Sequence, residues 1–178
     1  YWWDATEYAW LIALILTQEL DEGEYHIYSP DMSFGIMGGQ AASTSFGGGK
    51  EYLIESFREQ GVEVGKLFEV LLQRNQAPER MQIPSSLEDG YLIDYDGYFI
   101  SYFKNDPEMN GWQRLRDENP CAHAFVTISV PAYDPETGII LVYIGWQGDW
   151  LFGSGDIYAF EYDGIRLKEI AIINLWIS

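Results

Sequence analysis

The sequence predicts an α+β domain, in which N-terminal and central helices pack on one face of a curved C-terminal antiparallel β-meander. Three observations predict this class. Helix-like segments fill most of the first two thirds of the chain, four strand-like runs follow from Ala124, and short turns join most of those runs. Helices followed by consecutive antiparallel strands are typical of α+β folds. An NTF2-like or cystatin-like arrangement is the analogy that this order of elements suggests.

The length and composition indicate a single domain. The chain has 178 residues, of which 47% are hydrophobic, and a domain of this size forms a core without help from a metal or a disulfide. We divide the domain into two parts. Residues 1–50 hold an N-terminal helix, a short strand and a glycine-rich interaction loop, and residues 51–178 form the α+β core.

The charge of the chain argues against several kinds of partner. The net charge is −18, from 28 acidic and 10 basic residues. Nucleic-acid binding depends on Lys and Arg side chains that replace counterions on phosphates, so we expect no nucleic-acid partner. The same repulsion disfavours an anionic membrane surface. The single cysteine, Cys121, leaves no disulfide within the chain.

The first predicted element is a helix from Asp4 to Leu20. Asp4 is a suitable N-cap, and Glu7 completes a capping-box pattern three residues later. The apolar run Tyr8–Leu16 leaves this helix almost no polar face, which predicts burial inside the domain or against another chain. The run is far shorter than the roughly 20 residues that cross a bilayer, so we expect no membrane span.

Two further segments complete the N-terminal part. Tyr25–Tyr28 predicts a short strand, whereas Ser33–Lys50 contains six glycines and follows neither a helical nor a strand period. We interpret the second segment as a loop that contacts a partner, together with the aromatic N-terminus. The contact residues predicted here are Tyr1, Trp2, Trp3, Trp10, Phe34 and Phe46.

The central part of the chain predicts three helices and one strand-like stretch. Glu51–Gln60 and Val62–Asn75 each carry an apolar stripe at helical spacing. Tyr91–Phe103 resembles a strand with one break in its middle. The third helix is expected to start at Asp106-Pro107, because Asp is a good N-cap and Pro suits the first helical position, and to stop at Asn119-Pro120.

Four predicted strands form the C-terminal meander. Their ranges are Ala124–Val130, Ile139–Trp146, Asp156–Tyr162 and Ile165–Ile177. Asp134–Gly138 and the pair Asp163-Gly164 are turn sequences. We expect the glycine-containing stretch Gln147–Gly155 to be a connecting loop. That loop would expose the aromatic side chains of Trp150 and Phe152, which we add to the predicted contact residues.

No stretch of the sequence has the full pattern of a catalytic or metal-binding motif. Cys121 and His123 would share a strand face, but an acidic surrounding disfavours a reactive thiolate, so we prefer a structural cysteine. Paired Cys or His motifs for zinc are absent. Asp94–Gly97 lacks further ligands of a calcium loop, and Asp134 with Glu136 is a weak calcium candidate. We therefore expect no cofactor and favour a protein that is not an enzyme.

A series of short motifs runs through most of the chain, apart from the glycine-rich loop and the first few residues, and it begins with the N-terminal helix and IYSPDM. It includes LLQRNQAP, Trp112, Asn119-Pro120, the segment TISVPAYDPETGIILVYIG, the GSG at 153–155 and the terminal NLWIS. These motifs resemble those of a family of exported bacterial proteins with no established activity, whose members carry "ALVYVG", "GSGYY" and "LWIS" at similar spacing. The resemblance implies the C-terminal meander and export to the cell envelope or beyond. The family's cysteines in the glycine-rich link are absent from this chain.

These observations predict an acidic, exported, non-enzymatic protein that acts through protein contacts, as a structural subunit of an extracellular or cell-surface assembly. Its partner would be another protein or further copies of itself. Two alternatives stay open. One is a small hydrolase with acidic residues in a cleft of the sheet, for which a deep pocket lined by two or more acids with shifted pKa values would be the sign. The other is a module that binds a sugar or another small ligand.

Overall fold

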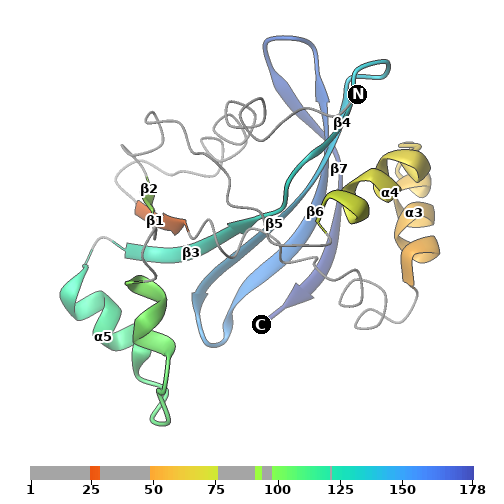
Figure 1. The fold of residues 1–178 in the computed structure, drawn as a ribbon. Coiled ribbons are helices and arrows are strands. Elements are labelled where there is room, and N and C mark those ends of the chain that lie inside the picture. The colour runs from red at the N-terminus through yellow and green to blue at the C-terminus, as the bar shows by residue number, and fades with distance from the viewer. Residues whose placement is uncertain (1–24, 29–48, 76–90, 94–97, 121) are drawn as a thin grey trace.

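The computed structural model describes residues 25–28, 49–75, 91–93, 98–120 and 122–178. Within these residues one seven-stranded sheet runs through the molecule, with helices toward both of its ends (Figure 1). The strand order is β2-β1-β3-β5-β6-β7, and β4 pairs with β5 beside this path. The fold is α+β, as predicted. The strands are β1 (Tyr25–Tyr28), β2 (Tyr91–Ile93), β3 (Ala122–Ile128), β4 (Ala132–Asp134), β5 (Ile139–Asp149), β6 (Phe152–Tyr162) and β7 (Leu167–Ile177).

The C-terminal part of the sheet is the predicted antiparallel meander. β3 pairs with β5, β5 with β6 and β6 with β7, always antiparallel. The predicted turn Asp134–Gly138 joins β4 to β5, with Gly138 at a φ of 74°. The turn between β6 and β7 spans residues 163–166 and is longer than predicted. It closes because the Asp163 carboxylate accepts the backbone N–H groups of Ile165 at 2.8 Å and Arg166 at 2.7 Å.

Two short parallel strands extend the sheet beyond the meander. The predicted strand Tyr25–Tyr28 is confirmed as β1, and the start of the strand-like stretch Tyr91–Phe103 is confirmed as β2. β1 runs parallel to β2 on one side and to β3 on the other. These pairings could not be predicted from the sequence, because no local pattern links strands that lie so far apart along the chain.

The predicted loop Gln147–Gly155 is wrong, since β5 and β6 continue through it and only Trp150 and Leu151 turn the chain. Glycines occur in this segment because neighbouring atoms lie too close to leave room for a Cβ atom. A Cβ atom on Gly153 would lie 2.7 Å from the Trp146 carbonyl oxygen, inside van der Waals contact. Glycine in a strand often marks such a place, and a high glycine content was therefore a misleading sign of a loop.

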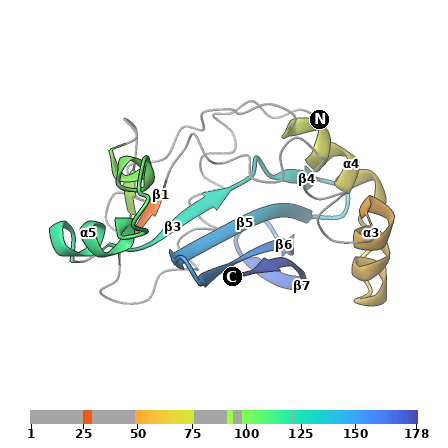
Figure 2. The same ribbon diagram turned by 90° about the horizontal axis from the view of Figure 1, so that it is seen from below.

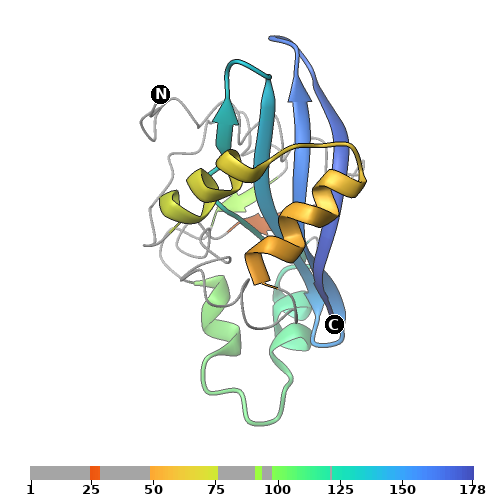
Figure 3. The ribbon, with the colours of Figure 1, turned by 90° about the vertical axis from the view of Figure 1, so that its right-hand side faces the viewer.

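Two helices cover one face of β4 to β7 (Figure 3). α3 (Gly49–Glu59) and α4 (Gly65–Arg74) confirm the two predicted central helices. α3 starts earlier than expected, so that Gly49 and Lys50 belong to the helix and not to the glycine-rich loop. Gly61 separates α3 from α4 with a φ of 83°, which a residue with a side chain adopts only at a cost.

The main core lies between these helices and the sheet. Phe57 of α3 and Phe68 of α4 are fully buried there. They belong to one cluster with alternate residues of the strands, as expected for amphipathic helices on a pleated face. The strand residues of this core are Ala132, Leu141, Tyr143, Ile157, Ala159, Ala171, Ile173 and Leu175.

Asn75 attaches the end of α4 to the sheet. Its side-chain amide donates to the carbonyl oxygens of Leu71 (2.8 Å) and Val130 (2.9 Å), and its side-chain oxygen accepts the Val130 N–H (2.8 Å). Asn75 is buried, and so is Val130. The three bonds satisfy backbone groups that water does not reach, as buried polar groups require.

A smaller helical unit lies at the opposite end of the sheet from α3 and α4 (Figure 2). It consists of the 3₁₀ helix η3 (Phe99–Phe103) and the α-helix α5 (Gly111–Glu118). The second half of the predicted strand Tyr91–Phe103 is thus wrong. Tyr102 of η3 packs with Trp112 and Leu115 of α5 in a separate small core, and this contact between two helices decides against a strand.

The start of α5 also differs from the prediction. The helix begins at Gly111 and not at Pro107. Asp106 nevertheless caps it, because its carboxylate accepts the N–H groups of Asn110 at 3.2 Å and Gly111 at 2.6 Å. Arg114 lies 3.5 Å from the same carboxylate and holds it in place. Asp106 is therefore the capping residue as predicted, but it acts from five positions before the helix.

Candidate interaction surface

An apolar surface gathers where β5 turns into β6. We name it the tip surface and define it by Met109, Trp146, Trp150, Leu151, Phe152 and Ile177. Leu151 is 86% exposed and Phe152 is 62% exposed, while Met109 and Ile177 are exposed as well. Trp146 and Phe152 contact each other edge to face, with 4.9 Å between ring centroids. Large apolar side chains exposed side by side are unusual on a protein surface and commonly mark a contact site.

The structure places Trp150 and Phe152 differently from each other, although both were predicted to be exposed. Phe152 is exposed, whereas Trp150 is half-buried. The Trp150 indole N–H donates to the Met109 carbonyl oxygen at 2.9 Å, and its ring lies 5.6 Å from that of Phe103. Trp150 thus contributes one edge to the tip surface and anchors the turn with the other.

Arg116 of α5 braces the same turn. Its guanidinium donates to the Asp149 carboxylate at 3.0 Å and to the Gly148 carbonyl oxygen, and it lies 5.5 Å from the centre of the Trp112 ring. The Asp149 carboxylate also accepts the Trp150 N–H at 2.7 Å. These bonds hold the turn to α5, so that the exposed side chains project from a supported position rather than from a free loop.

The tip surface is poor in charge although the chain is strongly acidic. Between Ile140 and Gly155 the sequence has one charged residue, Asp149, and that carboxylate is paired with Arg116 at 3.0 Å. The centres of protein interfaces are likewise depleted in charge and enriched in aromatic residues, Met and Arg. The run of uncharged residues was the signal in the sequence that could have identified Leu151, which our prediction missed. Met109 and Ile177 were missed as well, and they lie outside this run.

The other predicted contact residues lie outside the described residues. These are Tyr1, Trp2, Trp3, Trp10, Phe34 and Phe46. The same applies to the predicted helix Asp4–Leu20, to Cys121 and to the sequence Asp94–Gly97. Their roles stay predictions.

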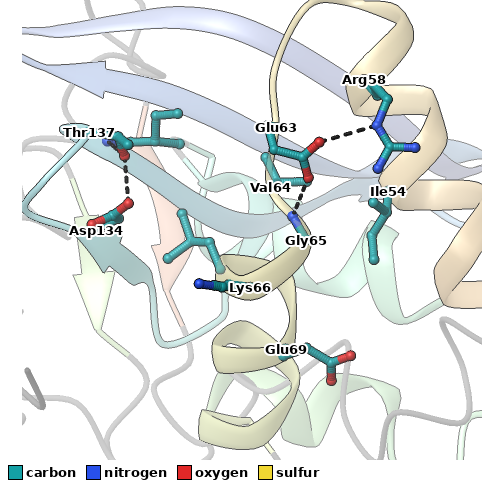
Figure 4. A pocket seen from close by; sticks show the side chains of 11 residues that line it. Ile54, Arg58, Glu63, Val64, Gly65, Lys66, Glu69, Asp134 and Thr137 are labelled. Carbon is teal, nitrogen blue, oxygen red and sulfur yellow. Dashed lines mark hydrogen bonds and ion pairs between the residues drawn. The ribbon is translucent and has the colours of Figure 1, made fainter.

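One pocket within the described residues lies between α3, α4 and the turn from β4 to β5 (Figure 4). It has a volume of about 710 Å³ and an apolar floor that includes Ile54 and Leu67. Carboxylates line it, but each already has a partner. Glu63 pairs with Arg58 at 3.1 Å, Glu69 pairs with Lys50, and Asp134 accepts the Thr137 hydroxyl at 2.8 Å. The bond between Thr137 and Asp134 lies within the turn from β4 to β5.

The electrostatics of this pocket do not favour acid–base chemistry. The Gly65 N–H donates to Glu63 at 3.1 Å and Arg58 binds the same carboxylate, and together they lower the pKa of Glu63. A carboxyl group whose pKa is lowered stays ionised near neutral pH, whereas a catalytic acid needs a raised pKa. The pKa shift of Glu63 is therefore opposite in direction to the shift that the catalytic acid of a hydrolase needs.

The strongest perturbation of a titratable group in the described part of the chain concerns Tyr102. Its hydroxyl donates to the Glu118 carboxylate at 2.5 Å and bonds the Tyr98 hydroxyl at 3.0 Å, and these contacts raise the pKa of Tyr102. Tyr102 is buried between η3 and α5, away from the pocket. We interpret this cluster as a link that joins the two helices.

No group of three or more His, Cys, Asp or Glu residues within the described ranges could hold a metal ion. The calcium candidate Asp134 instead accepts the N–H of Glu136 at 3.0 Å within its turn. Among the helices that the structure describes, none has the length and apolarity that crossing a bilayer requires.

Comparisons of the chain with protein-family models, with curated proteins and with solved structures found no match. The resemblance to a family of exported bacterial proteins and the analogy with NTF2-like or cystatin-like folds therefore stay expectations from the sequence.

Proposed function

We propose that this protein is not an enzyme and that it acts through protein contacts made by the tip surface. The observation that carries this proposal is the exposure of Leu151 (86%) and Phe152 (62%) on a turn that Arg116 braces. An exposed leucine alone would need no explanation, but Leu151 and Phe152 are exposed next to each other on a supported turn, and Phe152 contacts Trp146.

The composition of the tip surface supports the same proposal. Trp146, Trp150 and Phe152 supply the aromatic side chains that dominate the energetics of many interfaces. Because the turn is already held in place by α5, little conformational freedom would be lost when a partner binds. The braced turn thus suits a surface that is ordered before binding.

The charge of the chain supports a role for an uncharged contact region. At a net charge of −18, two copies of this chain, or this chain and another acidic protein, repel each other at long range. An interface between such molecules forms most easily where charge is lowest, and the tip surface is such a place. We therefore place this protein as a structural subunit of an assembly, and the family resemblance suggests that the assembly is extracellular or at the cell surface.

The test compares two substitutions that both place a charge on an exposed apolar position. Phe152→Asp puts a carboxylate into the tip surface, whereas Ile165→Asp puts one on the turn between β6 and β7, where Ile165 is 80% exposed. The association of each purified full-length chain is measured by light scattering over a wide range of concentrations, and thermal unfolding confirms that each variant is folded.

We expect the wild-type chain and Ile165→Asp to associate in the same way with rising concentration, and Phe152→Asp to remain less associated. A wild-type chain that stays a monodisperse monomer at high concentration would contradict self-assembly through the tip surface. Equal association of all three chains would show that the contact lies elsewhere.

A further inference from the structure

The outer edge of β7 is the second place where this molecule could pair with another chain. Among the strands that the structure describes, β7 is the last in the order of the sheet and pairs only with β6. An edge strand presents unpaired N–H and C=O groups that another strand can bind, and natural proteins protect such edges with specific devices. The groups that cover the edge of β7 therefore indicate which part of it could pair with another strand.

Gln60 occupies the middle of this edge. Its side-chain amide donates to the Ile172 carbonyl oxygen at 3.0 Å, and its side-chain oxygen accepts the Ile172 N–H at 3.3 Å. A primary amide carries one acceptor and donors in the arrangement of a peptide group. Gln60 thus makes the pair of bonds that one residue of a neighbouring antiparallel strand would make. Within the described residues, no other side chain from outside β7 bonds its backbone.

The position of Gln60 is fixed by the end of α3. The Gln60 N–H donates to the Phe57 carbonyl oxygen at 3.0 Å, and Gly61 then turns the chain away with its φ of 83°. The side-chain amide also donates weakly to the Ser56 carbonyl oxygen at 3.4 Å. The packing of α3 on the sheet therefore positions the Gln60 side-chain amide at the outer edge of β7.

Irregularities on both sides of Ile172 shorten the part of the edge that could pair. The register pairs Gly155 with Trp176 and Asp156 with Asn174, so that Leu175 is an extra residue on β7. Ile170 is a second extra residue, between the pairs that Ala171 and Glu169 make with β6. Such bulges disrupt pairing. The regular stretch is thus short, and its outward backbone groups come from Ile172, which Gln60 covers, and from Asn174.

We propose that Gln60 is an autoinhibitory plug on β7, and that its removal lets β7 pair antiparallel with β7 of a second copy around Ile172. The second copy is the occupant that the sequence favours. In a two-fold pairing centred on Ile172, Ala171 faces Ile173 within the regular stretch, so no charged side chains oppose each other there. Ile172, which is 38% exposed, faces its own counterpart.

The experiment is carried out in the Phe152→Asp background, so that association through the tip surface does not contribute. Gln60→Ala removes the plug. Gln113→Ala is the matched control, because Gln113 is an exposed glutamine whose amide bonds only Asp117 at 2.7 Å. Gln60→Ala combined with Ile172→Pro removes the outward N–H itself, a change that an edge strand tolerates. Light scattering measures association, and hydrogen exchange measures protection of the Ile172 amide.

We expect Gln60→Ala to form dimers as its concentration rises, and the Gln113→Ala and Gln60→Ala/Ile172→Pro chains to stay monomeric. In dilute Gln60→Ala the Ile172 amide should exchange about fivefold faster than in the parent, because one hydrogen bond is lost, and this exchange should slow again at high concentration. A monomeric Gln60→Ala chain with an unchanged fold overturns the proposal, and so does association that Ile172→Pro leaves intact.

A readout from the parent chain covers the case in which Gln60→Ala does not fold. The backbone N–H groups of Ile172 and Asn174 lie on the same, outer side of β7 by strand alternation. Within the described residues, only the Ile172 N–H has a side-chain acceptor from outside the strand. We expect the Ile172 amide to exchange more slowly than the Asn174 amide. Equal exchange of the two amides would mean that Gln60 does not hold the edge.

Discussion

Replacing Gly155 with alanine tests whether close approach, rather than flexibility, explains the glycines of β6. A Cβ atom on Gly155 would lie 2.0 Å from Nε1 of the Trp176 ring and 2.5 Å from its Cε2 atom. Contacts this short do not occur between folded side chains, so the indole must move. The Trp176 N–H now donates to the Tyr143 hydroxyl at 3.0 Å, and the movement breaks this bond.

The expected cost follows from these two effects. Forcing extra volume into a packed site costs about 1–3 kcal/mol, and the lost hydrogen bond adds about 1 kcal/mol. We therefore expect Gly155→Ala to lower the free energy of unfolding by roughly 2–4 kcal/mol. Gly61→Ala is a useful comparison. It introduces no contact within 4 Å, and its positive φ alone should cost about 1–2 kcal/mol.

Urea unfolding of four chains measures this prediction: the wild type, Gly155→Ala, Trp176→Leu and the double variant. If the clash with the indole is the cause, Gly155→Ala should cost at least about 1 kcal/mol less when Trp176 is already leucine, which is a coupling that double-mutant cycles resolve. An equal cost in both backgrounds would refute the argument, as would a Gly155→Ala chain of wild-type stability.

Two further predictions concern the attachment of the helices. Asn75→Ala leaves both backbone groups of buried Val130 without their partner, so urea unfolding should show a loss of about 2–4 kcal/mol, and a loss under 1 kcal/mol would contradict this role. The raised pKa of Tyr102 means that its hydroxyl stabilises the fold fully below about pH 10, the usual pKa of tyrosine, and that this contribution declines as the pH rises further. Urea midpoints between pH 8 and 11 should therefore fall more steeply for the wild type than for Tyr102→Phe, and parallel curves would contradict the assignment.

The elements that the sequence predicted correctly are those with a local signal. α3 and α4 carry apolar stripes at helical spacing, and the turn Asp134–Gly138 has the residues that such turns need. The two errors arose where a local signal in the sequence was overridden by packing. Phe99–Phe103 alternates like a strand but forms a 3₁₀ helix against α5, and Gln147–Gly155 has the composition of a loop but forms strands. Propensity is a weak prior in such places.

The tip surface likewise has features that the sequence indicated and features that it could not. The aromatic richness of the C-terminal part suggested a contact surface and pointed to Trp150 and Phe152, and the structure describes both at the tip surface. The bracing by Arg116 could not be predicted, because its partner Asp149 lies 33 residues further along the chain. No spacing rule connects such residues, since only the packing of α5 beside β5 brings them together.

The sequence by itself determined the α+β class, the antiparallel order of β3, β5, β6 and β7, and the charge-poor run that supplies most of the tip surface. These features follow from hydrophobic period, turn residues and composition, which act over a few residues. The tertiary structure alone decided the parallel addition of β1 and β2, the braced tip and the contact of Gln60 with Ile172, which spans 112 residues. Such contacts depend on the final packing of helices on the sheet, because one hydrogen bond between distant residues leaves no pattern in the local sequence.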